Sequence, residues 1–133
     1  MNVLLFRVGR NLNRAYRTAE AFGVERLLLL ECAENQAHGN LFGATGRVEV
    51  VDIGEWPDGT GLLALEPRYH THIARIDWGR VETVVVGGEN VTLPRALPAE
   101  QRAMIPMVGK VSCLTVEAAL AIALYEWRRS ERI

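Results

Sequence analysis

Hydrophobic positions along the chain form short apolar runs that are separated by amphipathic stretches or by segments rich in Gly, Pro, Asn and Asp. The runs predict strands over residues 3–8, 26–31, 47–53, 61–66 and 82–87, with a short sixth strand at 104–106. Helical patterns cover residues 12–22 and 114–129. Near-continuous apolar strands separated by helices or long crossings are typical of a sheet covered on both sides. The sequence therefore predicts an α/β fold, with a mostly parallel sheet and helices on both faces.

The first predicted helix, with Asn11 as its N-cap and Gly23 just past its end, has one apolar and one basic side. Its apolar side carries Leu12, Ala15, Tyr16, Ala19 and Phe22, and its basic side carries Arg10, Arg14 and Arg17. An arginine stripe is often only a solvated face. However, three cations at the start of a helix oppose its dipole, which favours a role in contacting phosphate or nucleic acid.

The second predicted helix, over residues 114–129, is apolar on two opposite sides. One side carries Val116, Leu120, Ala123, Leu124 and Trp127, and the other carries Ala118, Ala121, Ile122 and Tyr125. A helix apolar on both sides must be covered on both sides. The second side could be buried within the monomer, but in so small a domain the pattern favours a homodimer formed through this helix.

Composition places the chain among compact globular proteins, with 133 residues, 49% hydrophobic and 23% charged. This predicts a single domain over residues 1–133, with no separate RNA-binding domain and no membrane span. A net charge of −1 argues against a generally basic nucleic-acid coat protein. Two distant cysteines, Cys32 and Cys113, and the lack of an export signal predict a reduced, cytoplasmic protein.

Several common cofactor sites do not fit the sequence. Gly109-Lys110 lacks the glycine that a P-loop needs at position 104, and Val111 stands where Ser or Thr is required. No GxGxxG follows a predicted strand, which disfavours a nicotinamide enzyme. The histidines, His38, His70 and His72, have no zinc-ligand spacing, so we expect no metal.

Three segments carry a more specific pattern: NLNRAYRTAEAFG at 11–23, VVVGGENVTL at 84–93, and IPMVG at 105–109, which continues through 113–118 and 124–126. In order and spacing they resemble the three motifs of the SpoU (TrmH) branch of the SPOUT RNA methyltransferases. The resemblance covers about residues 11–128. It implies a C-terminal trefoil knot, a homodimer, and binding of S-adenosylmethionine (AdoMet).

The activity that this resemblance implies is methyl transfer from AdoMet to a ribose 2′-hydroxyl of RNA. We expect tRNA rather than rRNA, because the small, domain-only members of the family tend to act on tRNA. By the resemblance, Arg17 activates the hydroxyl and Asn11 helps to shape the same site, while Arg10, Arg14 and Arg17 hold the RNA. Arg128, Arg129 and Arg132 could extend this surface.

The resemblance also assigns a cofactor pocket, in which Gly87 allows a close backbone approach and Glu89 matches the acidic residue of the family. The residues assigned to it are Leu65, Glu66, Gly87, Glu89, Ile105, Met107, Cys113 and Leu114. The sequence departs from the family pattern at Asn13, Arg14, Thr92, Cys113 and Thr115. These departures leave an alternative open, a catalytically degenerate knot-fold dimer that binds RNA or nucleotide without methyl transfer.

Overall fold

The computed structural model describes residues 1–10, 12–32, 47–58, 61–67, 71–111 and 113–131. Three residues singled out above, Asn11, His38 and His70, lie outside the described residues, as does Arg132. No helix in the described ranges has the length and apolar character needed to cross a membrane.

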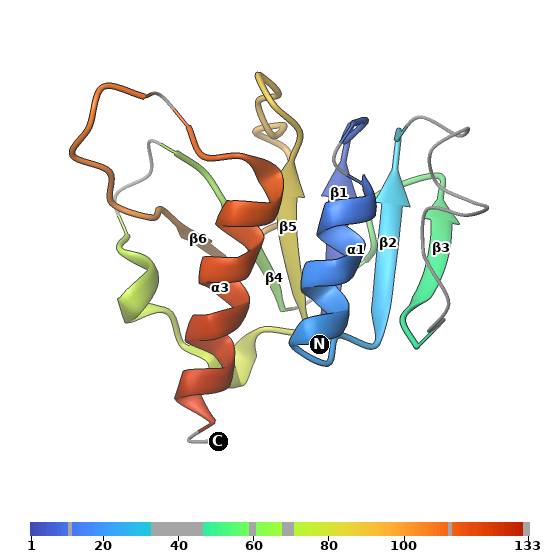
Figure 1. Cartoon of the computed structure of the whole chain (residues 1–133), viewed down its shortest axis with the longest axis horizontal. Coiled ribbons are helices and arrows are strands. Elements are labelled where there is room, and N and C mark those ends of the chain that lie inside the picture. The colour runs from blue at the N-terminus through green and yellow to red at the C-terminus, as the bar shows by residue number, and fades with distance from the viewer. Residues whose placement is uncertain (11, 33–46, 59–60, 68–70, 112, 132–133) are drawn as a thin grey trace.

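A six-stranded sheet forms the centre of the molecule (Figure 1), in the order β3-β2-β1-β5-β4-β6. Every pair of neighbouring strands is parallel. In the middle of the sheet, Leu4 of β1 lies opposite Leu28 of β2 and Val85 of β5. The strands are β1 (Asn2–Phe6), β2 (Arg26–Leu30), β3 (Glu49–Ile53), β4 (Leu62–Leu65), β5 (Thr83–Gly87) and β6 (Gln101–Ala103). The prediction of a mostly parallel α/β fold is confirmed.

The position predicted for the sixth strand was wrong. β6 ends at Ala103, before the apolar residues that suggested a strand, and Met104 makes only an isolated bridge to His72. Pro106 lacks the N–H that a strand needs. Pairing with β4 instead fixes residues 101–103, since Glu100 N donates to Leu62 O and Glu66 N donates to Ala103 O.

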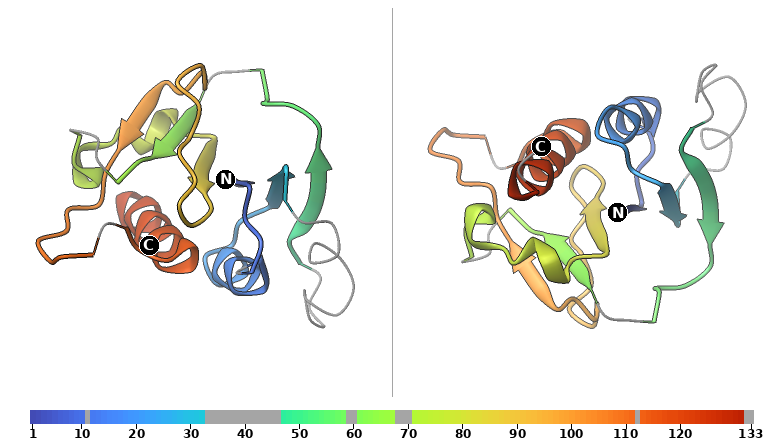
Figure 2. Two further views of the ribbon diagram at one scale, coloured as in Figure 1. Left: turned by 90° about the horizontal axis from the view of Figure 1, so that it is seen from above. Right: turned by 90° about the horizontal axis from the view of Figure 1, so that it is seen from below.

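Both long helices pack on the same face of the sheet (Figures 1 and 2), α1 (Leu12–Ala21) beside α3 (Val116–Ser130). Their buried side chains form one core with alternate residues of the strands. The helix residues of this core are Leu12, Ala15, Tyr16 and Ala19 of α1, and Val116, Leu120, Ala123 and Leu124 of α3. The apolar side predicted for the first helix and the core-facing one of the two predicted for the second are therefore confirmed.

Segments without regular helix cover the opposite face of the sheet in the described part of the chain. Leu93 and Leu97, from the segment between β5 and β6, pack there against Leu4 and Val85. Phe6 lies against Trp56 with 4.9 Å between ring centroids. The expectation of helices on both faces is thus corrected for the described residues, and the trefoil knot stays a prediction.

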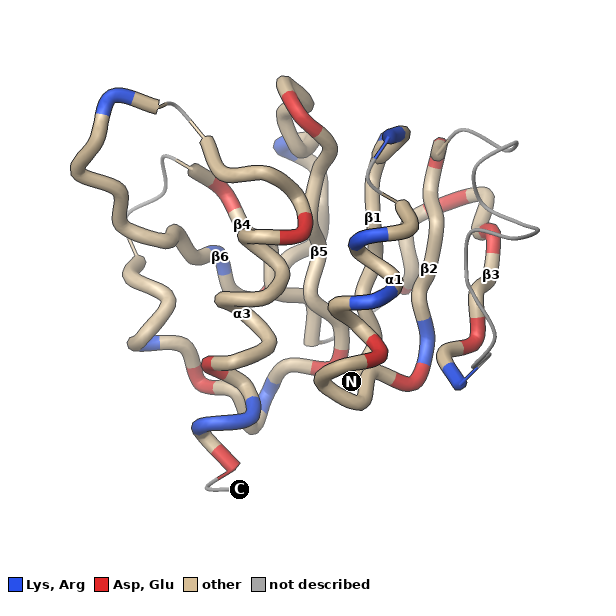
Figure 3. Tube along the Cα trace, viewed as in Figure 1, with Lys and Arg blue, Asp and Glu red and all other residues tan. Residues whose placement is uncertain are grey.

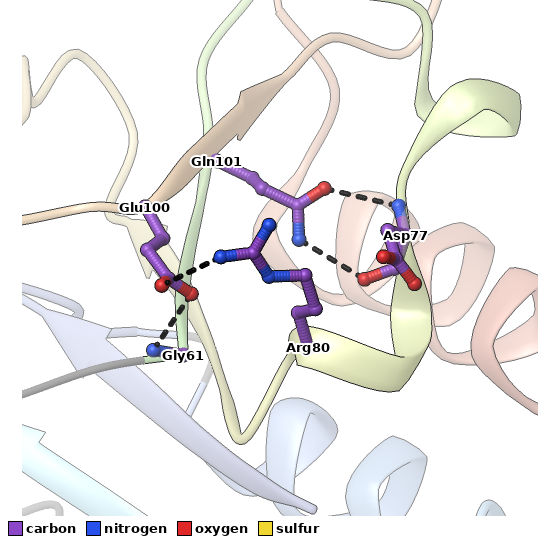
Figure 4. Close-up of polar contacts among 5 residues, drawn as sticks. All are labelled: Gly61, Asp77, Arg80, Glu100 and Gln101. Atoms are coloured by element: carbon purple, nitrogen blue, oxygen red, sulfur yellow. Dashed lines mark hydrogen bonds and ion pairs between the residues drawn. The ribbon is translucent and has the colours of Figure 1, made fainter.

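Polar contacts fasten the amino-terminal end of β6 to a short 3₁₀ helix, η3 (Trp78–Arg80), as Figure 4 shows. A second such turn, η2 (Ile73–Arg75), precedes it. The Glu100 carboxylate accepts hydrogen bonds from Gly61 N (3.2 Å) and from Arg80 Nη2 (3.3 Å). The Gln101 amide accepts from Asp77 N and donates to Asp77 O, both at 3.0 Å. These contacts set the register of β6 at the end of the sheet where its strands begin.

The end of α1 is held by a side chain of α3. Gly23 follows the helix with φ of +75°, as its predicted place past the end requires. Arg128 Nε donates to Phe22 O (2.8 Å), and its guanidinium lies 4.0 Å from the centroid of the Trp127 ring. Arg128 thus satisfies a carbonyl that α1 leaves without an intrahelical partner.

We expect Arg128→Ala to lower the free energy of unfolding by about 2 kcal/mol, because a hydrogen bond from a charged donor to a partly buried carbonyl is lost. Urea unfolding of the purified protein measures this change. Arg129→Ala is the matched control, since Arg129 bonds only Glu126 at an exposed position, and no measurable loss is expected there. Equal losses in the two variants would contradict the capping role.

Candidate functional site

A pocket of about 590 Å³ opens where β4, β5 and β6 end, against the start of α3. Open parallel sheets place their ligand sites at this edge, because the segments that follow the strands meet there. The pocket is lined by Leu65, Glu66, Pro67, Val86, Gly87, Gly88, Glu89, Asn90, Val91, Thr92, Leu93, Ile105, Met107, Cys113, Leu114, Val116 and Ala119. All eight residues predicted for cofactor binding are among them.

The lining is largely apolar and contains two carboxylates, Glu66 and Glu89, but no Lys, Arg or His among the described residues. An apolar slot of this size suits a flat heterocycle, with polar groups needed only to orient it. The lining includes the unbroken segment from Val86 to Leu93. The absence of a cation disfavours an anionic ligand such as a nucleotide phosphate.

The sequence analysis did not single out Gly88, whose backbone lies against the backbone that follows β1. Its N–H donates to Phe6 O (2.9 Å). A Cβ on Gly88 would collide with the carbonyl oxygen of Arg7 and lie 3.3 Å from Val8 Cα. The paired glycines after the β5 run were the available signal, but sequence alone could not say which of them needs the space.

Gly87 is also crowded, in its case by the segment that follows β5. A Cβ there would lie 3.3 Å from Val91 O and 3.3 Å from Leu93 Cδ2, both in the segment that folds back over the pocket. The close approach that the structure shows is therefore to the chain itself. Asn90 makes this turn with φ of +57°, a conformation that Asn tolerates better than most residues.

Other lining residues that the sequence analysis missed come from three places: the segment Asn90–Leu93, Pro67 after β4, and Val116 and Ala119 of α3. The two α3 residues were interpreted only as part of an apolar helix. Their spacing of three puts them on one side of the first turn, which is the side that closes the pocket.

The arginine stripe of α1 lies outside the pocket. Figure 3 shows basic positions along α1, which is next to α3. Arg10, Arg14 and Arg17 are all exposed, and none lines the pocket of its own chain. Arg14 Nη1 reaches Glu117 Oε1 at 3.5 Å, whereas Arg10 and Arg17 have no ion-pair partner among the described residues.

The C-terminal arginines do not form a comparable free surface. Arg128 holds the end of α1, as described above, and Arg129 Nη2 bonds Glu126 Oε2 at 2.7 Å. That hydrogen bond raises the pKa of the Arg129 guanidinium. Neither Arg128 nor Arg129 is therefore free to extend the arginine stripe of α1.

The two cysteines occupy different environments. Cys113 lines the pocket, while Cys32 lies beside β1 and its thiol donates to Leu5 O (3.3 Å). Burial raises the pKa of the Cys32 thiol, so it stays protonated and is a poor nucleophile. Across the described ranges, no three His, Cys, Asp or Glu side chains lie together as metal ligands would.

Comparison with known proteins gives a family match over nearly the whole chain. Residues 2–125 match the model of the SpoU rRNA Methylase family. No curated protein matches the chain by sequence.

Solved structures show the same fold. An RNA 2′-O ribose methyltransferase shares 20% identity and a TM-score of 0.81, over 100% of this chain and 57% of its own. The SpoU methyltransferase AviRb from Streptomyces viridochromogenes, in complex with AdoMet, shares 22% identity and a TM-score of 0.81, over 99% of this chain and 60% of its own. A protein whose structure concerns the 2-OH methylation of C/U34 on tRNA shares 21% identity and a TM-score of 0.79, over 99% of this chain and 91% of its own. The chain therefore spans less than two thirds of the length of the first two.

Proposed function

Because the chain belongs to the SpoU rRNA methylase family, we propose that it is an AdoMet-dependent RNA methyltransferase that acts on a ribose 2′-hydroxyl. One observation carries the proposal. The eight residues assigned to cofactor binding come from four separate segments, and all of them line the same pocket. Chance would not gather them at the end of the sheet where α/β proteins bind nucleosides.

The pocket suits the adenosine part of AdoMet in size and chemistry. Leu65, Ile105 and Leu114 provide apolar surface for the base, and the backbone of the 86–93 segment provides donors and acceptors for its edge. Bound AdoMet supplies a methyl group already activated by its sulfonium. The two lining carboxylates, Glu66 and Glu89, are compatible with that positive charge.

The protein must then hold the 2′-oxygen in line with the methyl group and assist loss of its proton. We assign that assistance to Arg17, with Asn11 shaping the same site. Arg17 is exposed on α1 and free of ion pairs in the described part of the chain, so it is available to RNA. Arg10 and Arg14 would contact phosphates beside it.

Among RNAs, we propose tRNA as the substrate, with residues 1–133 acting as a single domain. The support is the match to a protein of similar length, of which this chain covers 91%, whose structure concerns tRNA methylation. The exposed arginines of α1 are the surface that we propose to hold the tRNA.

Calorimetric titration with AdoMet tests the proposal, with S-adenosylhomocysteine and NADH run in parallel. Micromolar binding of the two sulfur compounds at one site per chain, with no NADH signal, is the expected result. Transfer of labelled methyl to bulk tRNA, followed by nucleoside analysis for 2′-O-methylation, then tests the reaction. Absence of both binding and transfer would refute the function.

A degenerate binding protein is the second candidate. Thr115 is the N-cap of α3, yet its side chain makes no capping hydrogen bond, and it has no amide to donate as the usual Asn of the family has. Cofactor binding without methyl transfer would support this candidate. Rescue of transfer by Cys113→Ser with Thr115→Asn would then identify these positions as the cause.

We propose that two copies associate through the outer side of the C-terminal helix, residues 114–129. Ile122 and Tyr125 on that side are 38% and 57% exposed, and Val108 and Val111 of the preceding segment are more exposed still. Large apolar side chains so exposed are typical of an interface. A two-fold dimer would cover the same surface on both copies.

Ile122→Glu with Tyr125→Glu is expected to convert a dimer to a monomer, because each copy would place two negative charges at the two-fold contact, four in all. Light scattering after size exclusion measures the mass. Ala21→Glu, at an exposed position of α1, is the control and should leave the dimer intact. A wild-type monomer, or a dimer that survives the double substitution, would contradict this interface.

A further inference from the structure

Arg102 lies on β6 behind the pocket and does not line it. Its side chain is only 19% exposed and makes two short hydrogen bonds. Nη1 donates to Glu66 Oε2 (3.0 Å), and Nη2 donates to Leu97 O (2.9 Å). The guanidinium reaches these two acceptors from two different nitrogens held in one plane, a geometry that the single ammonium nitrogen of a lysine does not reproduce.

The two acceptors lie in two different segments. Glu66 follows β4 and lines the pocket directly. Leu97 lies in the segment between β5 and β6, beyond its last lining residue, Leu93, and its side chain is buried with Leu93 in the core on the other face of the sheet. β4 and β6 are paired so that Ala64 lies opposite Arg102. One side chain therefore links Glu66 to the segment that leads into β6.

The Glu66 carboxylate is left half satisfied by this arrangement. Its side chain is 21% exposed, and Oε2 is bound to Arg102, while Oε1 has no hydrogen-bond partner among the described residues. A partly buried carboxylate oxygen at a pocket wall favours a donor from a ligand. Without a cation in the lining, Arg102 is the charge that compensates Glu66.

We propose that Arg102 is a positioning residue of this pocket. It fixes Glu66 so that Oε1 accepts a hydrogen bond from a donor group of the nucleoside ligand, while its bond to Leu97 O holds the guanidinium in place. This inference rests on the proposed function, since it takes an adenosine-type ligand to occupy the pocket.

Calorimetric binding of S-adenosylhomocysteine to the full chain tests it. Arg102→Gln should weaken binding roughly tenfold, since a charged hydrogen bond is lost behind the site. Arg102→Lys keeps the charge but not both bonds, and should fall between Arg102→Gln and the wild type. Arg80→Gln is the matched control: it breaks the Arg80–Glu100 ion pair (Figure 4), which lies next to the start of β6, and neither residue lines the pocket, so binding should stay unchanged.

A double-mutant cycle separates positioning from a general loss of structure. If Arg102 acts through Glu66, adding Arg102→Gln to Glu66→Ala should weaken binding by less than about twofold further. Multiplying losses, or equal losses in Arg102→Gln and Arg80→Gln, would overturn the role. If the Gln variant does not fold, wild-type affinity in Arg102→Lys would overturn it equally. Failure of the wild type to bind refutes the proposed function, whereas normal wild-type binding with unchanged Arg102 variants refutes only this inference.

Discussion

Arg17→Ala is expected to lower methyl transfer to RNA roughly 10²- to 10⁴-fold, the range typical for loss of a group that assists proton transfer. The variant should bind AdoMet as the wild type does, because Arg17 is exposed on α1 and does not line the pocket. Its fold should also be unaffected, since the side chain has no ion-pair partner in the described ranges. Single-turnover transfer at saturating RNA, together with calorimetric titration of AdoMet, measures both quantities.

A matched control distinguishes a specific role from a general loss of positive charge. Arg26→Ala removes an arginine that is also exposed. It pairs with Glu49 where β2 and β3 begin, at the end of the sheet opposite to the pocket. Transfer should stay near the wild-type rate in that variant. If Arg17→Ala retains full activity, Arg17 has no part in the reaction. If both variants lose activity equally, the effect is one of overall charge.

Arg14 differs from Arg17 in its contacts, although both belong to the same stripe. Its guanidinium is 3.5 Å from Glu117, on the first turn of α3 between pocket residues Val116 and Ala119. The sequence placed all three arginines on one side of the helix but could not show this contact, because the partner lies 103 positions away. Helical spacing predicts which residues share a face, and only packing decides what that face meets.

Four of the five strands that were predicted at the right place share one physical property, and β3, which is only half-buried, is the exception. The apolar runs that became β1, β2, β4 and β5 are mostly buried among their neighbours, so hydrophobicity alone identifies them. The prediction misplaced β6 because its residues, which include the polar Gln101 and Arg102, show no strand pattern. They form a strand because they pair with β4 and because Arg102 bonds Glu66. Tertiary pairing overrides local propensity most easily in such a short edge strand.

The sequence predicted eight residues of the pocket but not the segments that complete its lining. The resemblance named residues at the ends of β4 and β5 and after β6, and the structure brings them together. It included Asn90 to Leu93 in a motif but did not assign them to the pocket, and this segment folds back so that Val91 O and Leu93 lie against Gly87. The turn at Asn90 depends on a backbone conformation, φ of +57°, that side-chain pattern does not indicate.

Gly88→Ala is expected to lower the free energy of unfolding by about 3 kcal/mol and to weaken binding of S-adenosylhomocysteine. The added Cβ would collide with the backbone carbonyl of Arg7, which cannot rotate away as a side chain could, so the ends of β1 and β5 must separate. This separation would also break the hydrogen bond from Gly88 N to Phe6 O. Because φ is not positive at Gly88, the cost comes from space and not from backbone conformation.

Gly87→Ala is the matched comparison for this prediction. Its Cβ would meet Val91 O and Leu93 Cδ2 at 3.3 Å, distances that a movement of a few tenths of an ångström in the overlying segment relieves. We therefore expect a stability loss of about 1 kcal/mol, with the larger effect on ligand affinity, because that segment forms a wall of the pocket. Urea unfolding and titration with S-adenosylhomocysteine of both variants measure the contrast. A Gly88→Ala protein as stable as Gly87→Ala would show that the ends of β1 and β5 can separate at little cost, and that Gly88 is not the residue that fixes this edge of the site.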